Sequence, residues 1–327
     1  MMRVLVFEYI TGGGCNQAAL PSSLAREGCL MLQALLADFS ALPAIELTVM
    51  LDSRLLAEVD TRAVQHLAII SPEQDTEAEF ARLLAAADAV WPIAPESDGV
   101  LLRLCLAVQA QGKRLLTSPA AAVAVTGDKY QAYRRLQQHG IATVATQLAD
   151  QAMFASGEWL IKPIDGAGCG GTYILPTQAA LAKHIIRSPR FIIQPHLHGE
   201  KTSLSCLFRH GESWLLSVNL QGFTVCDHQY VLQDIIVNDR PVTSAYQQVA
   251  AQVAKACPEL WGYVGIDLIE TPEIIWVLEI NPRLTSSFAA LRSALGINVA
   301  ELVLQLLHGS PAITVSTDQA ITLTLHS

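Results

Sequence analysis

The first 117 residues alternate between short β-like runs and longer Ala- and Leu-rich runs with helical spacing. Strands that alternate with helices favour a parallel sheet with helices on both faces. Ligands of such sheets sit at the carboxyl ends of the strands, where residues 11–14 follow the first run. The expected strands are 3–7, 46–51, 67–70, 89–92 and 114–117, and the expected helices are 24–39, 77–87 and 98–111.

The pattern changes after residue 117, and the rest of the chain predicts a second, α+β domain. Residues 118–140 predict two helices, and Gly140 is suited to end the second. We therefore divide the chain into an N-terminal α/β domain, 1–117, and a second domain, 118–327. Its expected strands are 143–147, 159–163, 172–175 and 191–194, a hairpin of 204–209 and 214–219 turned through His210-Gly211, and a pair at 265–269 and 274–280, with helices at 245–256 and 299–307.

The composition is that of a compact globular protein, because 51% of the 327 residues are apolar and 16% are charged. The net charge of −9 has the wrong sign for a nucleic-acid partner. Seven scattered cysteines without a C-x-x-C pair argue against disulfides or a zinc knuckle and favour a reducing cytoplasm. Residues 1–10 are too few to span a bilayer and include Glu8, so we expect a strand there and no signal peptide.

A lysine on an expected strand is followed by a loop rich in glycine. Lys162 precedes Asp-Gly-Ala-Gly-Cys-Gly-Gly-Thr at residues 165–172. Glycine lets a backbone approach phosphates closely and point several N–H groups at them, and the lysine adds a positive charge. An ordinary glycine-rich hairpin with a surface lysine explains the pattern equally well, because the loop matches neither a P-loop nor a dinucleotide fingerprint.

Two carboxylates and an amide are expected to share one face of a strand pair. Glu279 and Asn281 stand two residues apart, so their side chains point to the same side of a strand. Asp267 can come from the neighbouring antiparallel strand. Hard oxygen ligands of this kind suit Mg²⁺. The alternative is that these residues are polar strand ends that face solvent.

Two weaker signals accompany the loop and the carboxylates. Lys129, in a Thr-Gly-Asp-Lys sequence, opens a helix and could place a second positive charge on a nucleotide, although a solvated helix lysine fits as well. The apolar run 191–194 enters a segment broken by proline, whose backbone can bond a base edge and whose Glu200 can hold ribose hydroxyls. His196 and His198 have no third nitrogen or sulfur ligand at a suitable spacing, so a surface hinge is favoured over a metal site.

These four segments, in this order, resemble the ATP-grasp superfamily, which includes D-alanine–D-alanine ligase, biotin carboxylase and carbamoyl phosphate synthetase. The resemblance covers about 118–327 and implies an ATP-grasp fold preceded by an α/β domain, with a smaller ATP-binding lobe near 126–193 and a larger lobe with the metal site at 194–327. It also implies ATP and Mg²⁺ as cofactors, with two ions expected and Mn²⁺ as a substitute. By residue, it implies phosphate binding by Lys129 and Lys162, a flexible loop with Gly166, Gly168, Gly170 and Gly171, an adenine hinge with Gln194, His196 and Leu197, a ribose contact at Glu200, and metal ligands at Asp267, Glu279 and Asn281.

A narrower resemblance links Phe-Glu-Tyr-Ile-Thr-Gly-Gly-Gly at 7–14, together with 279–287, to the tyramine–L-glutamate ligases of methanofuran and methylofuran biosynthesis. It implies that an acyl phosphate forms on the γ-carboxyl of glutamate and that the amine of tyramine attacks it. Lys162 and Arg283 would be catalytic, Arg283 by holding the carboxylate or the oxyanion, although a structural ion pair explains Arg283 as well. The candidate substrate contacts are Glu8, Thr11, Gly12, Gly13, Ser286 and Ser287, of which the two serines can equally cap a helix.

Three other functions fit the same residues. One is a different amide ligase, for a dipeptide or for tailoring a cofactor. Another is a kinase of this fold, which would leave a phosphorylated product and need no second acceptor. The third is a nucleotide-binding module without catalysis, which three metal-ligand positions argue against. In each case we expect small-molecule partners, an amino acid and an amine for a ligase, with no nucleic acid and no membrane, and the sequence leaves a homodimer open.

Overall fold

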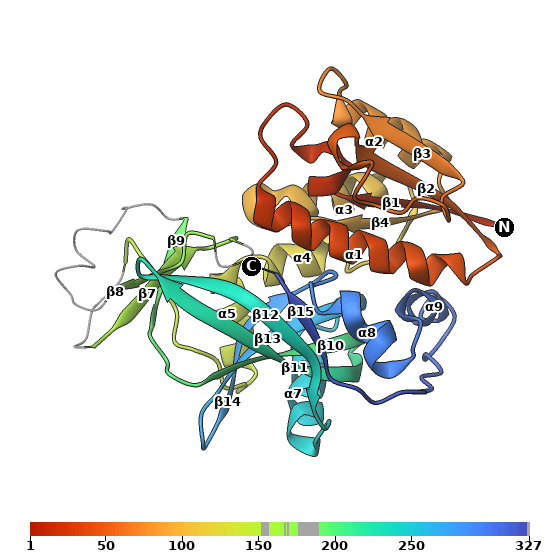
Figure 1. Ribbon diagram of the computed structural model, residues 1–327. Coiled ribbons are helices and arrows are strands. Elements are labelled where there is room, and N and C mark those ends of the chain that lie inside the picture. The colour runs from red at the N-terminus through yellow and green to blue at the C-terminus, as the bar shows by residue number, and fades with distance from the viewer. Residues whose placement is uncertain (152–156, 167, 169, 176–189, 326–327) are drawn as a thin grey trace.

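The computed structural model describes residues 1–151, 157–166, 168, 170–175 and 190–325, and it contains two sheets (Figure 1). The first sheet is parallel, with the strand order β3-β2-β1-β4-β5. All five strands expected in the first 117 residues are confirmed. They are β1 (Met2–Glu8), β2 (Ile45–Asp52), β3 (His66–Ile70), β4 (Ala89–Ile93) and β5 (Arg114–Leu115).

Helices cover both faces of the first sheet, and alternating residues of β1 show why. Val4 and Val6 belong to the same apolar cluster as Leu32 and Leu35 of α1 (Ser22–Ser40). The residues between them point the other way, because successive side chains of a strand face opposite sides. Leu5 and Phe7 accordingly pack with side chains from α2 (Thr76–Ala86) and α3 (Val100–Ala110). The three expected helices are therefore confirmed.

The chain leaves β1 through the tight turn Ile10–Gly14, where glycine is required. Gly13 has a φ of 97°, a conformation that residues with a Cβ rarely adopt. A Cβ placed there would lie 2.5 Å from Cγ2 of Ile70 on β3. The turn is thus packed against the sheet, and its sequence is fixed by space as well as by conformation.

The second sheet has ten strands, nine of them in the order β14-β13-β10-β11-β12-β8-β7-β9-β6, with β15 paired to β12. The predicted hairpin is confirmed: β10 pairs with β11, Arg209 faces Glu212, and His210 and Gly211 both have positive φ, as a two-residue turn requires. The strands are β6 (Gln147–Leu148), β7 (Trp159–Pro163), β8 (Tyr173–Leu175), β9 (Phe191–Pro195), β10 (Glu200–Arg209), β11 (Glu212–Cys226), β12 (Gln229–Arg240), β13 (Gly262–Glu270), β14 (Ile275–Asn281) and β15 (Ile321–Thr324).

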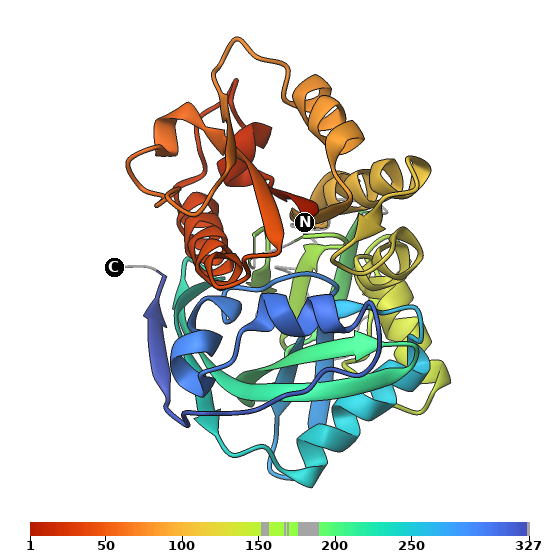
Figure 2. The same ribbon diagram turned by 90° about the vertical axis from the view of Figure 1, so that its right-hand side faces the viewer.

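Helices connect the two sheets and join them into one body. The two helices expected before Gly140 are α4 (Ala120–Thr126) and α5 (Lys129–Gln138), and Gly140 has a φ of 68°. Helix α7 (Ser244–Ala256) packs on β10 and β11. Helix α1 lies against α8 (Phe288–Leu295) and α9 (Val299–Gln305), so the first part rests on the second (Figures 1 and 2).

The expected strand at 143–147 was wrong in most of its length. Only its last residue enters β6, while Thr143 forms a single bridge to Val277 and the N–H of Val277 donates to the carbonyl of Ala142. The start of the segment thus contacts β14 and its end pairs with β9, so it forms no continuous strand. Strands β12 and β15 were not expected from the sequence. Among the described residues no single helix is long and apolar enough to cross a membrane; α8 and α9 meet that test only as a pair bent by 99°.

Candidate active site

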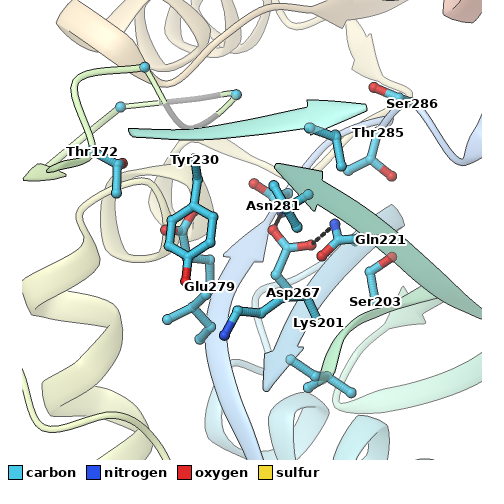
Figure 3. A pocket seen from close by; sticks show the side chains of 18 of the residues that line it. Thr172, Lys201, Ser203, Gln221, Tyr230, Asp267, Glu279, Asn281, Thr285 and Ser286 are labelled. Atoms are coloured by element: carbon cyan, nitrogen blue, oxygen red, sulfur yellow. Dashed lines mark hydrogen bonds between the residues drawn. The ribbon is translucent and has the colours of Figure 1, made fainter. Parts of the chain in front are cut away.

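A pocket opens where the second sheet, the glycine loop and α1 come together (Figure 3). It gathers most of the side chains that the sequence analysis singled out, although they are up to 158 positions apart, from Lys129 to Ser287. Two loop residues, Ala167 and Cys169, lie outside the described residues. The expected residues that line the pocket are Lys129, Lys162, Gly166, Gly168, Gly170, Asp267, Glu279, Asn281, Arg283, Ser286 and Ser287.

Strands β13 and β14 bring the three oxygen-bearing side chains to one face of the sheet. Asp267 stands opposite Glu279 in the antiparallel register, and Gly265 stands opposite Asn281. The amide of Asn281 donates to Oδ2 of Asp267 at 2.9 Å, and the amide of Gln221 on β11 donates to Oδ1 at 3.0 Å (Figure 3). The predicted clustering of Asp267, Glu279 and Asn281 is therefore present in the structure.

The two carboxylates repel each other, and the two lysines stabilise the ionised form of Glu279. Burial, and then the charge of Glu279, raises the pKa of Asp267 to about 6. Burial acts on Glu279 in the same direction, but Lys129 and Lys162 outweigh it and lower the pKa of Glu279. Two carboxylates and an amide oxygen on one face of the sheet fit a divalent cation bound through oxygen ligands.

Both lysines reach Glu279 from the elements where they were expected. Lys162 on β7 has its Nζ 2.6 Å from Oε1 of Glu279, and Lys129 at the start of α5 has its Nζ 3.6 Å from Oε2. Lys129 also donates to the carbonyl oxygen of Gly166 in the loop. Asp128 fixes the start of α5, because its side chain accepts from the N–H groups of Tyr130 and Gln131. Gly171 is not among the lining residues, and a Cβ placed on it would lie 3.0 Å from Cγ of Pro163.

Arg283 borders the pocket while it holds a carboxylate of the first part of the chain. Its Nε and Nη2 donate to Oε1 and Oε2 of Glu96 at 2.9 and 2.8 Å, and its Nη1 donates to the carbonyl of Leu284. The ion pair considered as an alternative is thus present. It is compatible with substrate binding only if the substrate reaches the guanidinium beside Glu96 or displaces that residue.

The expected hinge residues Gln194, His196 and Leu197 do not line the pocket, although Lys201 and Tyr230, which contact two of them, do. The amide of Gln194 is buried and donates to Oγ1 of Thr146 at 2.8 Å, whereas its Oε1 has no hydrogen-bond partner among the described residues. The carbonyl of Leu197 accepts from Nζ of Lys201 at 3.1 Å. The side chain of His196 is 5% exposed and lies outside the lining of the pocket.

Glu200 does not line the pocket, and its neighbour Lys201 does. Side chains alternate along β10, so Lys201 and Ser203 face the pocket while Glu200 faces the opposite side. There Glu200 is paired with Arg240 at 2.6 Å, and this ion pair lowers its pKa. The ribose contact implied for Glu200 therefore has no support from the position of its side chain, and Lys201 was missed. The two-residue period of β10 was the signal that could have found it.

The first part of the chain contributes one side chain to the pocket, as far as the described residues define it. Glu27 of α1 reaches the lining, and its carboxylate accepts a hydrogen bond from Oγ of Ser286. The sequence analysis missed Glu27, because one glutamate on a helix gives no signal of its own. Ser287 stands at the N-terminus of α8 without capping it, and its hydroxyl contacts those of Ser205, Thr285 and Tyr263.

The residues of the first turn do not reach the pocket, contrary to expectation. Glu8 is 3% exposed, and its carboxylate accepts from the N–H of Thr11 at 2.6 Å. Thr11 is fully buried, and the site of a Cβ on Gly12 or Gly13 is filled by neighbouring side chains. Burial raises the pKa of Glu8 to about 6. These four residues shape the N-terminal sheet and its contact with α1, so a direct substrate contact is not supported for them.

Comparisons with known proteins agree with this architecture. Residues 126–287 match the model of the ATP-grasp domain family, and residues 45–123 match that of the pre ATP-grasp 3 domain. The chain is 26% identical to tyramine–L-glutamate ligase of Methanocaldococcus fervens over 294 residues, 89% of each chain. It is 24% identical to the enzyme of that name from Methanocaldococcus jannaschii over 304 residues, which cover 92% of this chain and 88% of the relative.

A solved structure shows the same fold. An ATP-grasp superfamily protein from Archaeoglobus fulgidus superposes with a TM-score of 0.75 at 23% identity, covering 99% of this chain and 92% of the other. The fold implied by the sequence motifs is thereby confirmed, including the α/β domain that precedes the ATP-grasp domain. The chain belongs to the ATP-grasp superfamily, as an ATP-dependent ligase that forms carbon–nitrogen bonds.

Proposed function

We propose that the chain joins the γ-carboxyl of L-glutamate to the amine of tyramine, with ATP converted to ADP and phosphate. The observation that carries the ligase part is the shared face of Asp267, Glu279 and Asn281, with two lysines directed at it. The choice of substrates is supported by the similarity to two enzymes named tyramine–L-glutamate ligase over about nine-tenths of the chain. A role in methanofuran or methylofuran biosynthesis follows only if these substrates are correct.

The first step would activate the carboxylate, because a carboxylate oxygen is a poor leaving group at neutral pH. Transfer of the γ-phosphoryl group of ATP turns that oxygen into a phosphate. Lys129 and Lys162 would turn from Glu279 to the nucleotide phosphates, and the loop N–H groups would stabilise charge on the transferring group. Mg²⁺, held by Asp267, Glu279 and Asn281, would supply further positive charge to the phosphates.

The second step needs an uncharged amine, and Glu27 is placed to receive its proton. The carboxylate of Glu27 lines the pocket next to Ser286 and on the side of Arg283. An incoming ammonium group would find this carboxylate as its partner and lose a proton to it before the nitrogen attacks the acyl phosphate. Phosphate leaves and an amide remains. Arg283 would hold the glutamate carboxylate or the oxyanion of the tetrahedral intermediate.

The test is ADP release combined with mass spectrometry of the product. Glutamate with tyramine should give γ-glutamyltyramine, ADP and phosphate, and either substrate alone should give little ADP. Phenethylamine is the matched control, because a site that hydrogen-bonds the tyramine hydroxyl disfavours an amine that leaves its partner unpaired. An amide with another amine but none with tyramine would remove the substrate assignment and keep the ligase. A stable phosphorylated product without an amide would instead indicate a kinase.

A further inference from the structure

Three potential metal ligands meet at the hinge segment, and none of them lines the pocket described above. They are Glu158, His196 and His198, and one ligand atom from each lies within 4.8 Å of the other two. Nε2 of His198 is 3.4 Å from Oε2 of Glu158, and Nδ1 of His196 contacts the same oxygen. The two imidazole rings have their centroids 4.3 Å apart. Spacing along the sequence concealed this group, since its carboxylate lies 38 positions before the first histidine.

Strand pairing explains why these residues meet. Strands β7 and β9 are antiparallel, with Trp159 opposite Pro195. Glu158 comes one position before β7 and His196 one position after β9, and the N–H of His196 donates to the carbonyl of Glu158 at 2.9 Å. His198 follows two residues later, past the end of β9, and folds back over the pair. The pairing of β7 with β9 therefore fixes the positions of Glu158 and His196. His198 lies on an exposed segment.

The geometry suits a cation bound by nitrogen and oxygen. Two ligands that are each about 2.1 Å from one tetrahedral zinc lie about 3.4 Å from each other. His198 and Glu158 already have that separation, whereas His196 would have to move away from Glu158 to admit an ion. The side chain of His196 is 5% exposed, that of Glu158 33% and that of His198 78%. The site is therefore buried on the side of His196 and open to solvent on the side of His198.

The second nitrogen of His196 also has a hydrogen-bond partner, which holds the ring in position. Its Nε2 lies 2.6 Å from the hydroxyl of Tyr230, so Nδ1 can face the ion while Nε2 carries the proton. Tyr230 also lines the ATP pocket. A movement of His196 can therefore affect bound nucleotide through the side chain of Tyr230. It can also do so through the backbone of the hinge segment.

We propose that Glu158, His196 and His198 form a binding site for a zinc-class divalent cation, separate from the Mg²⁺ site, and that occupancy alters ATP binding. Two imidazoles and one carboxylate favour zinc and its transition-metal neighbours, whereas Mg²⁺ prefers a set of oxygen ligands. The ion would tie the end of β9 to the start of β7 and hold the hinge in one position. Water would complete its coordination on the exposed side.

The experiment is a titration with Co²⁺ of the full chain without a histidine tag, in the presence of excess Mg²⁺. Wild type should take up one ion through nitrogen and oxygen ligands, without the charge-transfer band that thiolate ligands give. His198→Ala and Glu158→Gln should each weaken binding at least tenfold. His66→Ala is the matched control, because His66 and Glu46 form an exposed pair with Nε2 and Oε1 2.8 Å apart and should bind no ion of their own. Equal affinity in wild type and His198→Ala would overturn the site.

The coupling to ATP has its own readout. Zn²⁺ at one equivalent should change the KM for ATP of wild type several-fold and leave that of His198→Ala nearly constant. Because both proteins keep the same Mg²⁺ ligands, displacement of Mg²⁺ would affect them equally and would count against the proposal. If cobalt binding depends on His198 but the KM does not respond, the link to ATP is overturned and the site alone remains.

Discussion

Lys162 and Glu279 form a half-buried ion pair, 2.6 Å from Nζ to Oε1, that joins β7 to β14 across 117 positions of the chain. Lys162, which is expected to bind phosphate, thus neutralises Glu279, which is expected to bind a cation. Two opposite charges held together in a pocket are costly to separate unless each gains a new partner. ATP with its metal ion would provide both partners at once, so the pair keeps the site charge-balanced until the nucleotide arrives.

Removing the oxygen ligands should abolish turnover without unfolding the protein. We expect Asp267→Asn, Glu279→Gln and Asn281→Ala each to lower ATP turnover about 10²- to 10³-fold, as the removal of groups that stabilise transition-state charge usually does. Steady-state ADP release and thermal melting, measured on the same samples, check this. Near-normal turnover in two of the three variants, with normal melting, would contradict the assignment of the metal site.

Asp267→Asn should also make the fold more stable. The pKa of Asp267 is raised to about 6 by burial and by Glu279, so at pH 7 its ionised form costs folding free energy. An amide removes that cost, and we expect a gain of about 1–3 kcal/mol at pH 7 that disappears below pH 4. Denaturant unfolding at both pH values measures it. A loss of stability at pH 7 would show that the hydrogen bonds from Gln221 and Asn281 matter more than the repulsion.

Glu27 should matter for the amine and not for activation of the carboxylate. We expect Glu27→Gln to lose at least tenfold in amide formation with tyramine and to keep most hydroxamate formation with hydroxylamine, which is already uncharged at neutral pH. Asp267→Asn is the comparison, because it should lose both reactions. Parallel assays of the two products decide the point, and an equal loss of both in Glu27→Gln would make this residue a general structural support.

The buried carboxylate of Glu8 should give the fold a defined pH dependence. Its pKa is raised from 4.5 to about 6 by burial, so the folded state holds the proton more tightly than the unfolded state does. Stability should therefore fall as the pH rises from 4.5 to 6 and stay level above that, by about 2 kcal/mol in total. Unfolding of wild type and Glu8→Gln across this window isolates the effect, because other groups cancel in the difference. If the difference in unfolding free energy between the two proteins is the same at pH 4 and pH 7, the raised pKa of Glu8 is contradicted.

Gly13→Ala should destabilise the protein far more than Gly112→Ala. Both glycines have positive φ, 97° and 65°, but a Cβ on Gly112 meets nothing within 4 Å, whereas one on Gly13 would lie 2.5 Å from Ile70. We expect about 1 kcal/mol for Gly112→Ala and several times that for Gly13→Ala. Chemical denaturation gives both values, and similar values would mean that Ile70 moves aside at little cost.

The sequence predicted those elements whose structure is determined by residues close together along the chain. The parallel sheet followed from the alternation of short β-like runs with helical runs in the first 117 residues. The β10–β11 hairpin followed from two flanking strands and a turn at His210-Gly211. The clustering of Asp267, Glu279 and Asn281 followed from the two-residue period of a strand and one antiparallel pairing. Each of these predictions depends on neighbours along the chain.

What could not be predicted depends on contacts between distant segments. Glu27 reaches the pocket only because α1 packs on α8, and Glu158 joins two histidines only because β7 pairs with β9. The conspicuous Thr-Gly-Gly-Gly at 11–14 misled the analysis for a related reason. Its glycines fill a crowded space beside Phe7 and Ile70, and a sequence pattern does not distinguish crowding from ligand binding.

Helix α1 combines two tasks that the chain otherwise keeps apart. Leu32 and Leu35 belong to the apolar cluster that includes Leu291 of α8 and Val303 of α9, while Glu27, near the other end of the helix, reaches the pocket. One helix therefore anchors the first part of the chain on the second and also brings a carboxylate to the pocket. Under the proposed mechanism, the first turns of α1 can change what the pocket offers to the amine, while the apolar residues further along the helix keep the two parts packed together.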